Sequence, residues 1–259
     1  MSPIPQRYNV LGVGVSALTL AQATELVVGA RGQLHRGYVC VTGVHGVMES
    51  QDDTGLKKVH NEAWLVTPDG MPLVWLGPRG VTRVYGPDLM LAVCDAGRAA
   101  GLTHFLYGGA PGVAEELKQK LCARFPGLAG AGTFTPPFRP RDDSELSALR
   151  AEVASTRPDV MWVGLSTPKQ ERFMAEHWRS LDAGVLIGVG AAFDFHTGRV
   201  RQAPRWMQRS GLEWLFRLVT EPRRLGPRYL RNNPRFAALV LAQRLGLRKY
   251  PLVLPAPPD

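Results

Sequence analysis

The chain has 259 residues, 45% of them hydrophobic and 20% charged, which is ordinary for a soluble globular protein with a substantial core. Its three scattered cysteines form no CxxC pair, which excludes a disulfide framework and leaves zinc chemistry unsupported, and no apolar run reaches the roughly 18–20 residues of a membrane-spanning helix. The net charge of +9 is uneven: residues 199–249 hold thirteen Lys or Arg against two Glu, a local +11 that leaves −2 elsewhere. Such a basic tail predicts an anionic partner, whether nucleic acid, anionic lipid or a phosphorylated substrate.

Short apolar runs alternate with segments of helical periodicity over about the first 190 residues. The apolar runs predict strands over residues 9–13, 38–42, 64–66, 103–107, 160–164 and 185–189. The segments between them predict helices over residues 19–28, 47–59, 87–100, 111–124, 144–156 and 168–178. This alternation is typical of an α/β domain with a mostly parallel sheet, which we expect to span residues 1–198. Ligands of such sheets bind at the carboxyl ends of the strands, so the loops after the strands are where a site is expected.

The stretch LGVGVSA (residues 11–17) follows the first predicted strand and matches the GxGxxA pattern of dinucleotide-binding loops. The expected helix start at Thr19 is too late for a phosphate to bind at a helix N-terminus directly after the glycines. The next predicted strand also ends without the acidic residue that would hold a ribose. An NAD-dependent oxidoreductase therefore remains an alternative, and a plain strand end is the favoured interpretation.

Asp69, in AWLVTPDGMPLVW, stands between two apolar runs, directly after a proline and before a glycine. Pro-Asp-Gly is a good turn sequence, so this aspartate could serve only to close a turn. The end of a strand is also where an α/β sheet presents groups for chemistry. The residues alone leave both interpretations open.

Two glycine pairs follow later predicted strands. Gly108 and Gly109, in LYGGAPGVAEEL, precede a proline-initiated helix, and paired glycines allow the backbone to approach a phosphate or nucleotide closely. Gly188 and Gly190, in IGVGAAFDFHTG, precede Asp194, which could accept hydrogen bonds from a base or a sugar. A structural turn and a satisfied structural acid explain the two stretches equally well.

The stretch VGLSTPKQERFM (residues 163–174) crowds polar and charged residues into the first turn of a predicted helix. Cations at that end oppose the helix dipole, which favours anions there. A solvated helix start is the plain alternative. The favoured interpretation is a site at which Gln170, with Lys169, faces an anionic or polyhydroxylated ligand.

After Gly198 the sequence contains no candidate strand, and proline punctuation predicts helices near residues 204–220, 222–231 and 234–245. We therefore expect a helical, Arg-rich appendage over residues 199–259. It interleaves aromatic residues with arginines, a combination that can bind nucleic acid or the surface of a membrane. A helix that packs its apolar side on the α/β domain is the plain alternative. No recognisable nucleic-acid motif accompanies it, which lowers the first option.

Many sugar-nucleotide enzymes hold a divalent cation with an Asp-x-Asp triplet that neutralises the diphosphate. This chain contains no such triplet. Arginines and helix ends would then have to neutralise a bound diphosphate, and the Arg-rich appendage could supply them. We expect neither a metal nor a cofactor.

Five stretches together resemble the WecG/TagA/CpsF family of bacterial glycosyltransferases. They are TPDGMPLVW, RVYGPDLM, LYGGAPGV, VGLSTPKQERFM and GVGAAFDFHTGRVRQAPRWMQRSGLEWLFRLVTEPRRLGPRYL, and they run in family order from about residue 38 to 230. The last stretch is long and highly specific. The resemblance implies a Rossmann-like α/β domain with a C-terminal appendage that helps to close the site and meets the membrane.

The resemblance also implies an activity. The expected enzyme is an inverting, metal-independent transferase that moves a hexose, of the ManNAc, ManNAcA or glucose type, from a UDP-sugar to a polyprenyl-diphosphate-linked saccharide. It would act in cell-surface polysaccharide biosynthesis, in the cytoplasm, as a peripheral protein on the inner face of the bacterial cell membrane. Its partners would be the donor, the acceptor and the membrane surface, without nucleic acid. Association into a homo-oligomer stays open.

Roles for individual residues follow from the same resemblance. The expected general base is Asp69, and the nucleotide-pocket aspartate is Asp194. The substrate-contacting residues of the family match Thr42, Arg83 and Gln170. The diphosphate-facing arginines of its appendage match Arg217, Arg224 and Arg228.

One departure concerns the donor sugar. Family members commonly carry an asparagine shortly after the threonine of the second strand, where this chain has Gly43 and Val44. Because that asparagine lies near the donor or acceptor sugar, its replacement leaves the donor identity open. His45 could substitute for it.

Overall fold

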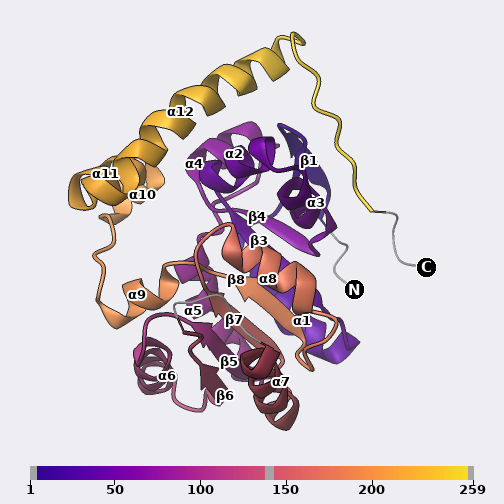
Figure 1. Ribbon diagram of the computed structural model, residues 1–259, viewed down its shortest axis with the longest axis vertical. Coiled ribbons are helices and arrows are strands. Elements are labelled where there is room, and N and C mark those ends of the chain that lie inside the picture. The colour runs from indigo at the N-terminus through magenta and orange to yellow at the C-terminus, as the bar shows by residue number, and fades with distance from the viewer. Residues whose placement is uncertain (1–4, 138–142, 256–259) are drawn as a thin grey trace.

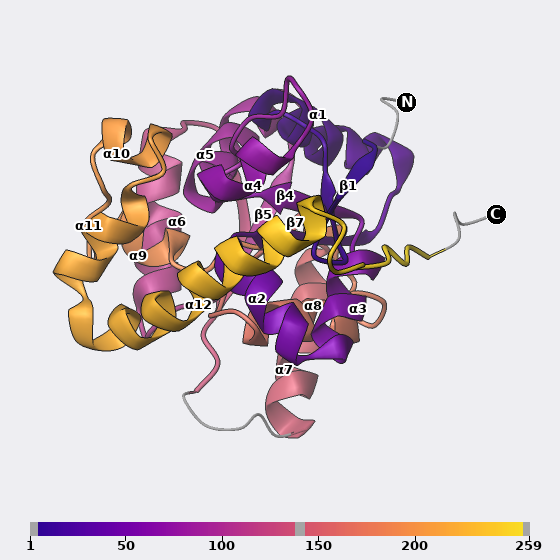
Figure 2. The same cartoon turned by 90° about the horizontal axis from the view of Figure 1, so that it is seen from above.

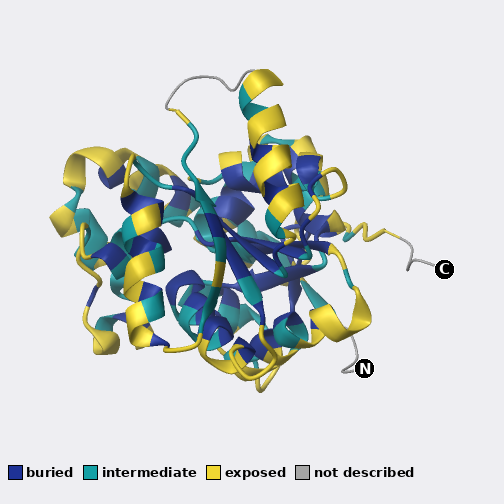
Figure 3. Ribbon diagram, turned by 90° about the horizontal axis from the view of Figure 1, so that it is seen from below, coloured by how far each residue is buried: buried dark blue, intermediate teal, exposed yellow. Residues whose placement is uncertain are grey.

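A parallel six-stranded sheet forms the centre of the computed structural model, which describes residues 5–137 and 143–255 (Figure 1). The strand order is β4-β3-β8-β7-β5-β6, and every neighbouring pair is parallel. The strands are β3 (Gly37–Thr42), β4 (Leu65–Pro68), β5 (Thr103–Gly108), β6 (Ala129–Phe134), β7 (Val160–Gly164) and β8 (Val185–Gly188). Figure 3 shows these strands largely as buried and the outer sides of the helices as exposed. The inner strands are near-continuous apolar runs because both of their faces are covered.

Alternate strand residues face two separate apolar layers, as Trp162 and Val163 of β7 do. The layer with Trp162 is closed by α1 (Leu20–Ala30), α5 (Gly86–Gly97), α6 (Val113–Arg124) and α9 (Ala192–Thr197). The layer with Val163 is closed by α2 (Val44–Asp52), α4 (Met71–Leu76), α7 (Asp143–Thr156) and α8 (Lys169–His177). These layers confirm the expected Rossmann-like α/β architecture.

The N-terminal run predicted as one strand is instead an antiparallel hairpin, β1 (Arg7–Val10) and β2 (Val13–Ser16), which lies outside the six-stranded sheet. Its two-residue turn consists of Leu11 and Gly12, with φ of 52° and 83°. Two successive positive φ angles match the twist of a tight hairpin, and glycine adopts the second without steric cost. The first glycine of LGVGVSA therefore closes a hairpin, and the interpretation of this stretch as a dinucleotide loop is wrong.

Other boundaries also differ from the prediction. The single helix expected over residues 47–59 is two helices, α2 and α3 (Thr54–Glu62). Asp53 leaves helical geometry between them, and its side chain caps α3 by accepting a hydrogen bond from the Leu56 amide at 3.0 Å. Strand β6, helices α4 and α9, and a short 3₁₀ helix at Arg31–Gln33 were not predicted.

The C-terminal helices are α10 (Arg205–Arg209), α11 (Glu213–Thr220) and α12 (Pro222–Arg244). Two helices were predicted where α12 is one helix of 23 residues that continues through Pro227 and Pro234. Each proline removes an N–H donor, which usually ends a helix. Both prolines lie on the exposed side of α12, so the carbonyl groups that lose a donor can bond to water instead.

Helix α12 runs past α2, and its far end meets the N-terminal hairpin (Figures 1 and 2). Arg235 donates hydrogen bonds of 2.7 Å to both carboxylate oxygens of Asp52 on α2. The Gln243 side chain accepts a hydrogen bond from the Leu11 amide at 3.1 Å. These contacts hold the second half of α12 against the α/β layers. Of the helices in residues 5–137 and 143–255, none combines the length and apolar character needed to cross a bilayer.

A glycine substitution tests the close approach of β5 and β7. Gly108 has φ of 119°, and an added Cβ would lie 2.6 Å from the carbonyl oxygen of Gly164. Gly108→Ala should therefore lower the free energy of unfolding by about 1–3 kcal/mol, as overpacking does, measured by urea denaturation. The control is Gly32→Ala, whose Cβ would meet no atom of the described chain within 4 Å. Equal stability of the two variants would contradict the strand packing.

Candidate functional site

A cleft of about 1350 Å³ lies between the carboxyl ends of the strands and the C-terminal helices. It is the place where ligands of parallel sheets bind. Ten of the twelve residues predicted for the site line it: Thr42, Asp69, Arg83, Gly109, Gln170, Gly190, Asp194, Arg217, Arg224 and Arg228. The structure therefore brings together residues that are far apart in the chain.

Gly108 and Gly188, the other two, are not among the residues that line the cleft. They end β5 and β8, one step before the loops that do. A Cβ on Gly188 would lie 2.8 Å from the Met174 methyl carbon and 3.0 Å from the Gln170 side-chain nitrogen. These glycines allow the strand ends to pack closely, and the backbone that lines the cleft is that of Gly109 and Gly190.

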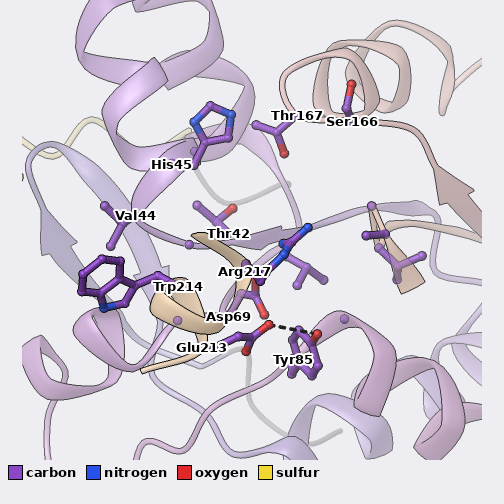
Figure 4. Close-up of a pocket in the computed structure, with 18 of the residues that line it drawn as sticks. Thr42, Val44, His45, Asp69, Tyr85, Ser166, Thr167, Glu213, Trp214 and Arg217 are labelled. Carbon is purple, nitrogen blue, oxygen red and sulfur yellow. Dashed lines mark hydrogen bonds between the residues drawn. The ribbon is translucent and has the colours of Figure 1, made fainter. Parts of the chain in front are cut away.

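Asp69 directly follows β4 and faces the cleft (Figure 4). Its amide donates to the carbonyl of Thr42 at 3.0 Å, which fixes the turn beside the end of β3. The side chain is 31% exposed. Its Oδ1 atom is buried and has no hydrogen-bond partner among the described residues, and we call it the open oxygen of Asp69. Oδ2 lies 3.7 Å from the point where a Cβ on Gly43 would stand, so Gly43 and Asp69 are neighbours in the cleft.

Burial raises the pKa of the Asp69 carboxyl to about 6. The nearby Arg83 guanidinium lowers that pKa, the Glu213 carboxylate raises it, and Arg217 and the Gly86 amide lower it. A carboxyl group whose pKa lies near the working pH is suited to take up a proton and release it again.

Arg83 and Tyr85 link Asp69 to α11. The Arg83 Nε–H donates to the backbone carbonyl of Asp69, and a terminal nitrogen of the same guanidinium lies 2.5 Å from Glu213. The Tyr85 hydroxyl donates to the other Glu213 oxygen at 3.1 Å, and the guanidinium stacks 4.0 Å above the tyrosine ring. Glu213 was not predicted, although it is one of the two glutamates in the basic segment over residues 199–249.

Gln170, at the start of α8, is 2% exposed and hydrogen-bonds the loop after β8. Its carbonyl oxygen accepts from the Gly190 amide at 3.0 Å, and its amide donates to Glu171 at 3.1 Å. Thr167 donates to the same Glu171 oxygen at 2.9 Å. Burial raises the pKa of the Glu171 carboxyl. Both ends of the Gln170 amide group thus bind protein atoms, which makes it a support of the cleft wall.

Four arginines of the C-terminal helices line the cleft: the predicted Arg217, Arg224 and Arg228, and also Arg244. Arg217 lies 3.6 Å from Glu221 and 5.6 Å from the centre of the Phe195 ring. Arg224 donates to Glu221 at 2.6 Å and is more exposed. The Nε–H groups of Arg217 and Arg228 are buried and have no hydrogen-bond partner in the described part of the chain. Buried donors of this kind favour an anionic ligand.

A second polar group lies across the cleft from Asp69, with His45, Ser166 and Thr167 (Figure 4). The His45 Nδ1 atom is 3.3 Å from the Asn232 amide nitrogen and 3.5 Å from Glu49. Burial and then the Arg228 charge lower the pKa of His45 to about 4, so its ring is neutral near pH 7. His45 lines the cleft as a neutral ring that is held by Asn232 and by the Thr167 backbone.

Asp194 on α9 faces the cleft from the side of the Gly109 and Gly190 loops. It is partly buried, and this burial raises the pKa of its carboxyl, whereas Arg199 and Arg224 lower it. An apolar wall of the cleft is formed by Met71 and Trp75 of α4 with Trp214 and Val240 of the C-terminal helices. Over the described ranges, His, Cys, Asp and Glu form no group of three or more that could hold a metal ion.

The pKa of Asp69 generates a prediction about stability. The folded-state value of about 6 exceeds the unfolded value of about 3.9, so the native state binds more protons between these pH values. Ionised Asp69 therefore destabilises the fold above about pH 6, and this cost disappears as the pH falls towards 4. Asp69→Asn should raise the free energy of unfolding by about 1–2 kcal/mol at pH 8, after allowance for partial exposure, and change it little at pH 4. A variant less stable than wild type at pH 8, in urea denaturation, would contradict the burial.

The comparison with known families agrees with this geometry. The family model described as Glycosyl transferase WecG/TagA/CpsF family matches residues 8–250, which include both the α/β layers and the C-terminal helices. Such transferases need a sugar donor and an acceptor, and they act in the synthesis of cell-surface polysaccharides. The chain therefore belongs to the WecG/TagA/CpsF family of glycosyltransferases.

Proposed function

We propose that this glycosyltransferase moves a hexose, of the ManNAc, ManNAcA or glucose type, from a UDP-sugar to a polyprenyl-diphosphate-linked saccharide with inversion at the anomeric carbon. Family membership supports the sugar donor and the acceptor. The observation that supports a single-base transfer is Asp69, whose carboxyl has a pKa of about 6 and faces a cleft lined by arginines and apolar side chains.

Inversion requires a single displacement, so one base is sufficient. The acceptor hydroxyl oxygen forms a bond to the anomeric carbon while its proton passes to Asp69. The bond between the anomeric carbon and the phosphate oxygen breaks, and its electron pair leaves with UDP. The open oxygen of Asp69 is available for that proton, since no described residue donates to it. Arg83, Thr42 and Gln170 hold the base and the loops around it in place.

The leaving UDP gains negative charge, which must be stabilised. We propose that Arg217, Arg224 and Arg228 do so, with Arg217 and Arg228 offering their buried Nε–H groups and Arg224 a more exposed guanidinium. They take the place that a divalent cation has in many sugar-nucleotide enzymes, so the proposed transfer needs no metal. The nucleotide then lies along Gly109, Gly190 and Asp194, which line the same cleft.

The apolar wall and the outer side of the C-terminal helices support a lipid-linked acceptor. Trp206, Val219 and Leu230 are 63%, 73% and 75% exposed, one on each of the three helices. Exposed apolar side chains among arginines bind the headgroup region of an anionic membrane. We therefore propose that residues 199–259 are a membrane- and substrate-binding appendage of a catalytic domain at residues 1–198, and that the enzyme is peripheral on the inner face of the bacterial cell membrane.

Neither alternative function gains a supporting observation. The hairpin turn at Leu11 and Gly12 replaces the phosphate loop that an NAD-dependent oxidoreductase would need. Several arginines that could bind nucleic acid instead line the cleft or pair with acids, as Arg235 does with Asp52.

Substitution of the proposed base tests the mechanism. Asp69→Asn should lower turnover by about 10²–10⁴-fold, the usual contribution of a general base. Turnover is measured as UDP release from a panel of UDP-sugars with polyprenyl-diphosphate-linked acceptors. Asp95→Asn, on the exposed side of α5, is the matched control and should keep wild-type turnover. Near-normal turnover of Asp69→Asn would remove Asp69 from this role.

The membrane proposal predicts a loss of vesicle binding. A double variant, Val219→Ser with Leu230→Ser, should weaken co-sedimentation with phosphatidylglycerol-containing vesicles by at least about tenfold, because each inserted side chain contributes about 1.5–3 kcal/mol. Leu34→Ser is the control, since Leu34 is 89% exposed but follows the 3₁₀ helix at Arg31–Gln33, outside the C-terminal helices. Equal vesicle binding by the wild type, the double variant and Leu34→Ser would contradict a membrane contact through α11 and α12.

A further inference from the structure

Glu213 is an acidic residue in a strongly basic segment, and its side chain is only 15% exposed. One carboxylate oxygen lies 2.5 Å from a terminal nitrogen of Arg83, and the other accepts the Tyr85 hydroxyl at 3.1 Å, the contact drawn as a dashed line in Figure 4. Arg83 and Tyr85 belong to the segment before α5, whereas Glu213 is the first residue of α11. The carboxylate therefore joins the C-terminal helices to the α/β layers at the site itself.

Arg83 lies between the carboxylates of Asp69 and Glu213, but it hydrogen-bonds only that of Glu213. Its terminal nitrogen is 3.7 Å from the open oxygen of Asp69, which is too long for a hydrogen bond. The same nitrogen is at hydrogen-bond distance from Glu213. Stacking over the Tyr85 ring and donation from Nε to the Asp69 backbone carbonyl fix the guanidinium in this orientation.

A paired arginine would interfere with a base. Arginine and carboxylate prefer a bidentate pair, in which two N–H groups occupy both carboxylate oxygens. Such a pair between Arg83 and Asp69 would occupy the open oxygen and lower the affinity of Asp69 for a proton. Glu213 competes for the guanidinium and so opposes that pair.

We propose that Glu213 is a positioning residue for the transfer: it holds the Arg83 guanidinium off the Asp69 carboxylate, and it does so only when α11 is docked on the α/β layers. This inference rests on the proposed role of Asp69 as the base. Docking of the C-terminal helices then completes the site by a direct contact. With α11 displaced, Arg83 is free to pair with Asp69.

The charged groups that face Asp69 determine the sign of the test. They are Arg83 from the segment before α5, together with Glu213 and Arg217 from α11, and the Gly86 amide also points at the carboxylate. Glu213 raises the pKa of Asp69, whereas Arg83 and Arg217 lower it. Neutralising Glu213 removes a repulsive charge and also frees Arg83, so both effects lower the pKa of Asp69.

The test is Glu213→Gln in the full-length protein, read by NMR titration of ¹³C-labelled aspartate, with the Asp69 signal assigned from its absence in Asp69→Asn. The pKa of Asp69 should fall by about one unit or more, the usual effect of a neighbouring charge. In the transfer assay, the acid limb of kcat/KM should move to lower pH by the same amount. The plateau kcat should fall by up to about tenfold, because a weaker base accepts the proton less well, with a smaller change in the donor KM.

Three further variants separate charge from structure. Glu213→Asp keeps the charge, so the pKa of Asp69 in this variant should stay close to the wild-type value. This variant is the substitute test if Glu213→Gln does not fold. Tyr85→Phe removes only a hydroxyl and should leave the pKa of Asp69 within about 0.3 unit of wild type, since no charge is lost. Glu25→Gln removes an exposed charge on α1 and should have no effect.

The outcomes distinguish this inference from the function on which it rests. An unchanged Asp69 pKa in folded Glu213→Gln, with normal sugar transfer by the wild type, would overturn the positioning role alone. A lowered pKa together with a shifted acid limb would support it. A lowered pKa with no transfer by the wild type from any UDP-sugar would overturn the proposed function and support only the contact between Glu213, Arg83 and Asp69.

Discussion

The site depends on one carboxylate that is held partly out of water beside a cation that it does not fully pair with. Ionised Asp69 costs free energy because burial removes hydration that Arg83, at 3.7 Å, only partly replaces. That cost raises the pKa of the carboxyl to about 6. The open oxygen accepts no hydrogen bond from the described chain, so it can accept a proton. A proton acceptor at neutral pH is thus obtained at the expense of local stability.

The fold positions this carboxylate by ordinary means. Parallel strands bring their carboxyl ends to one edge, where the amide of Asp69 bonds to the end of β3. Glycine at the last positions of β5 and β8 lets neighbouring backbone and Gln170 approach closely. The C-terminal helices then close the cleft from the other side, with Glu213 bonded to Arg83 beside the base and Arg235 holding α12 to α2.

Much of the sheet and the polar side of the cleft could be predicted, because buried strands are apolar runs and their loops carry the polar residues. Strand β6 was missed because its sequence, AGAGTF, is rich in small residues. It lies at the edge of the sheet, where most of its side chains are only partly buried and large apolar residues are not required. Continuation of α12 through two prolines depends on which side of the helix faces solvent, which the sequence alone does not state. Glu213 was missed because its partner Arg83 is 130 residues away, and only the fold brings them together.

The pH dependence of kcat/KM for sugar transfer tests the role of Asp69 most directly, because it reports the essential base of the free enzyme. If Asp69 is that base, kcat/KM should be constant above about pH 6 and should fall about tenfold per pH unit below it, as the carboxylate becomes protonated. The same acid limb should be absent from the residual activity of Asp69→Asn. A profile that stays level from about pH 4.5 to 8 would contradict a base of this pKa, and with it the proposed role of Asp69 in the transfer.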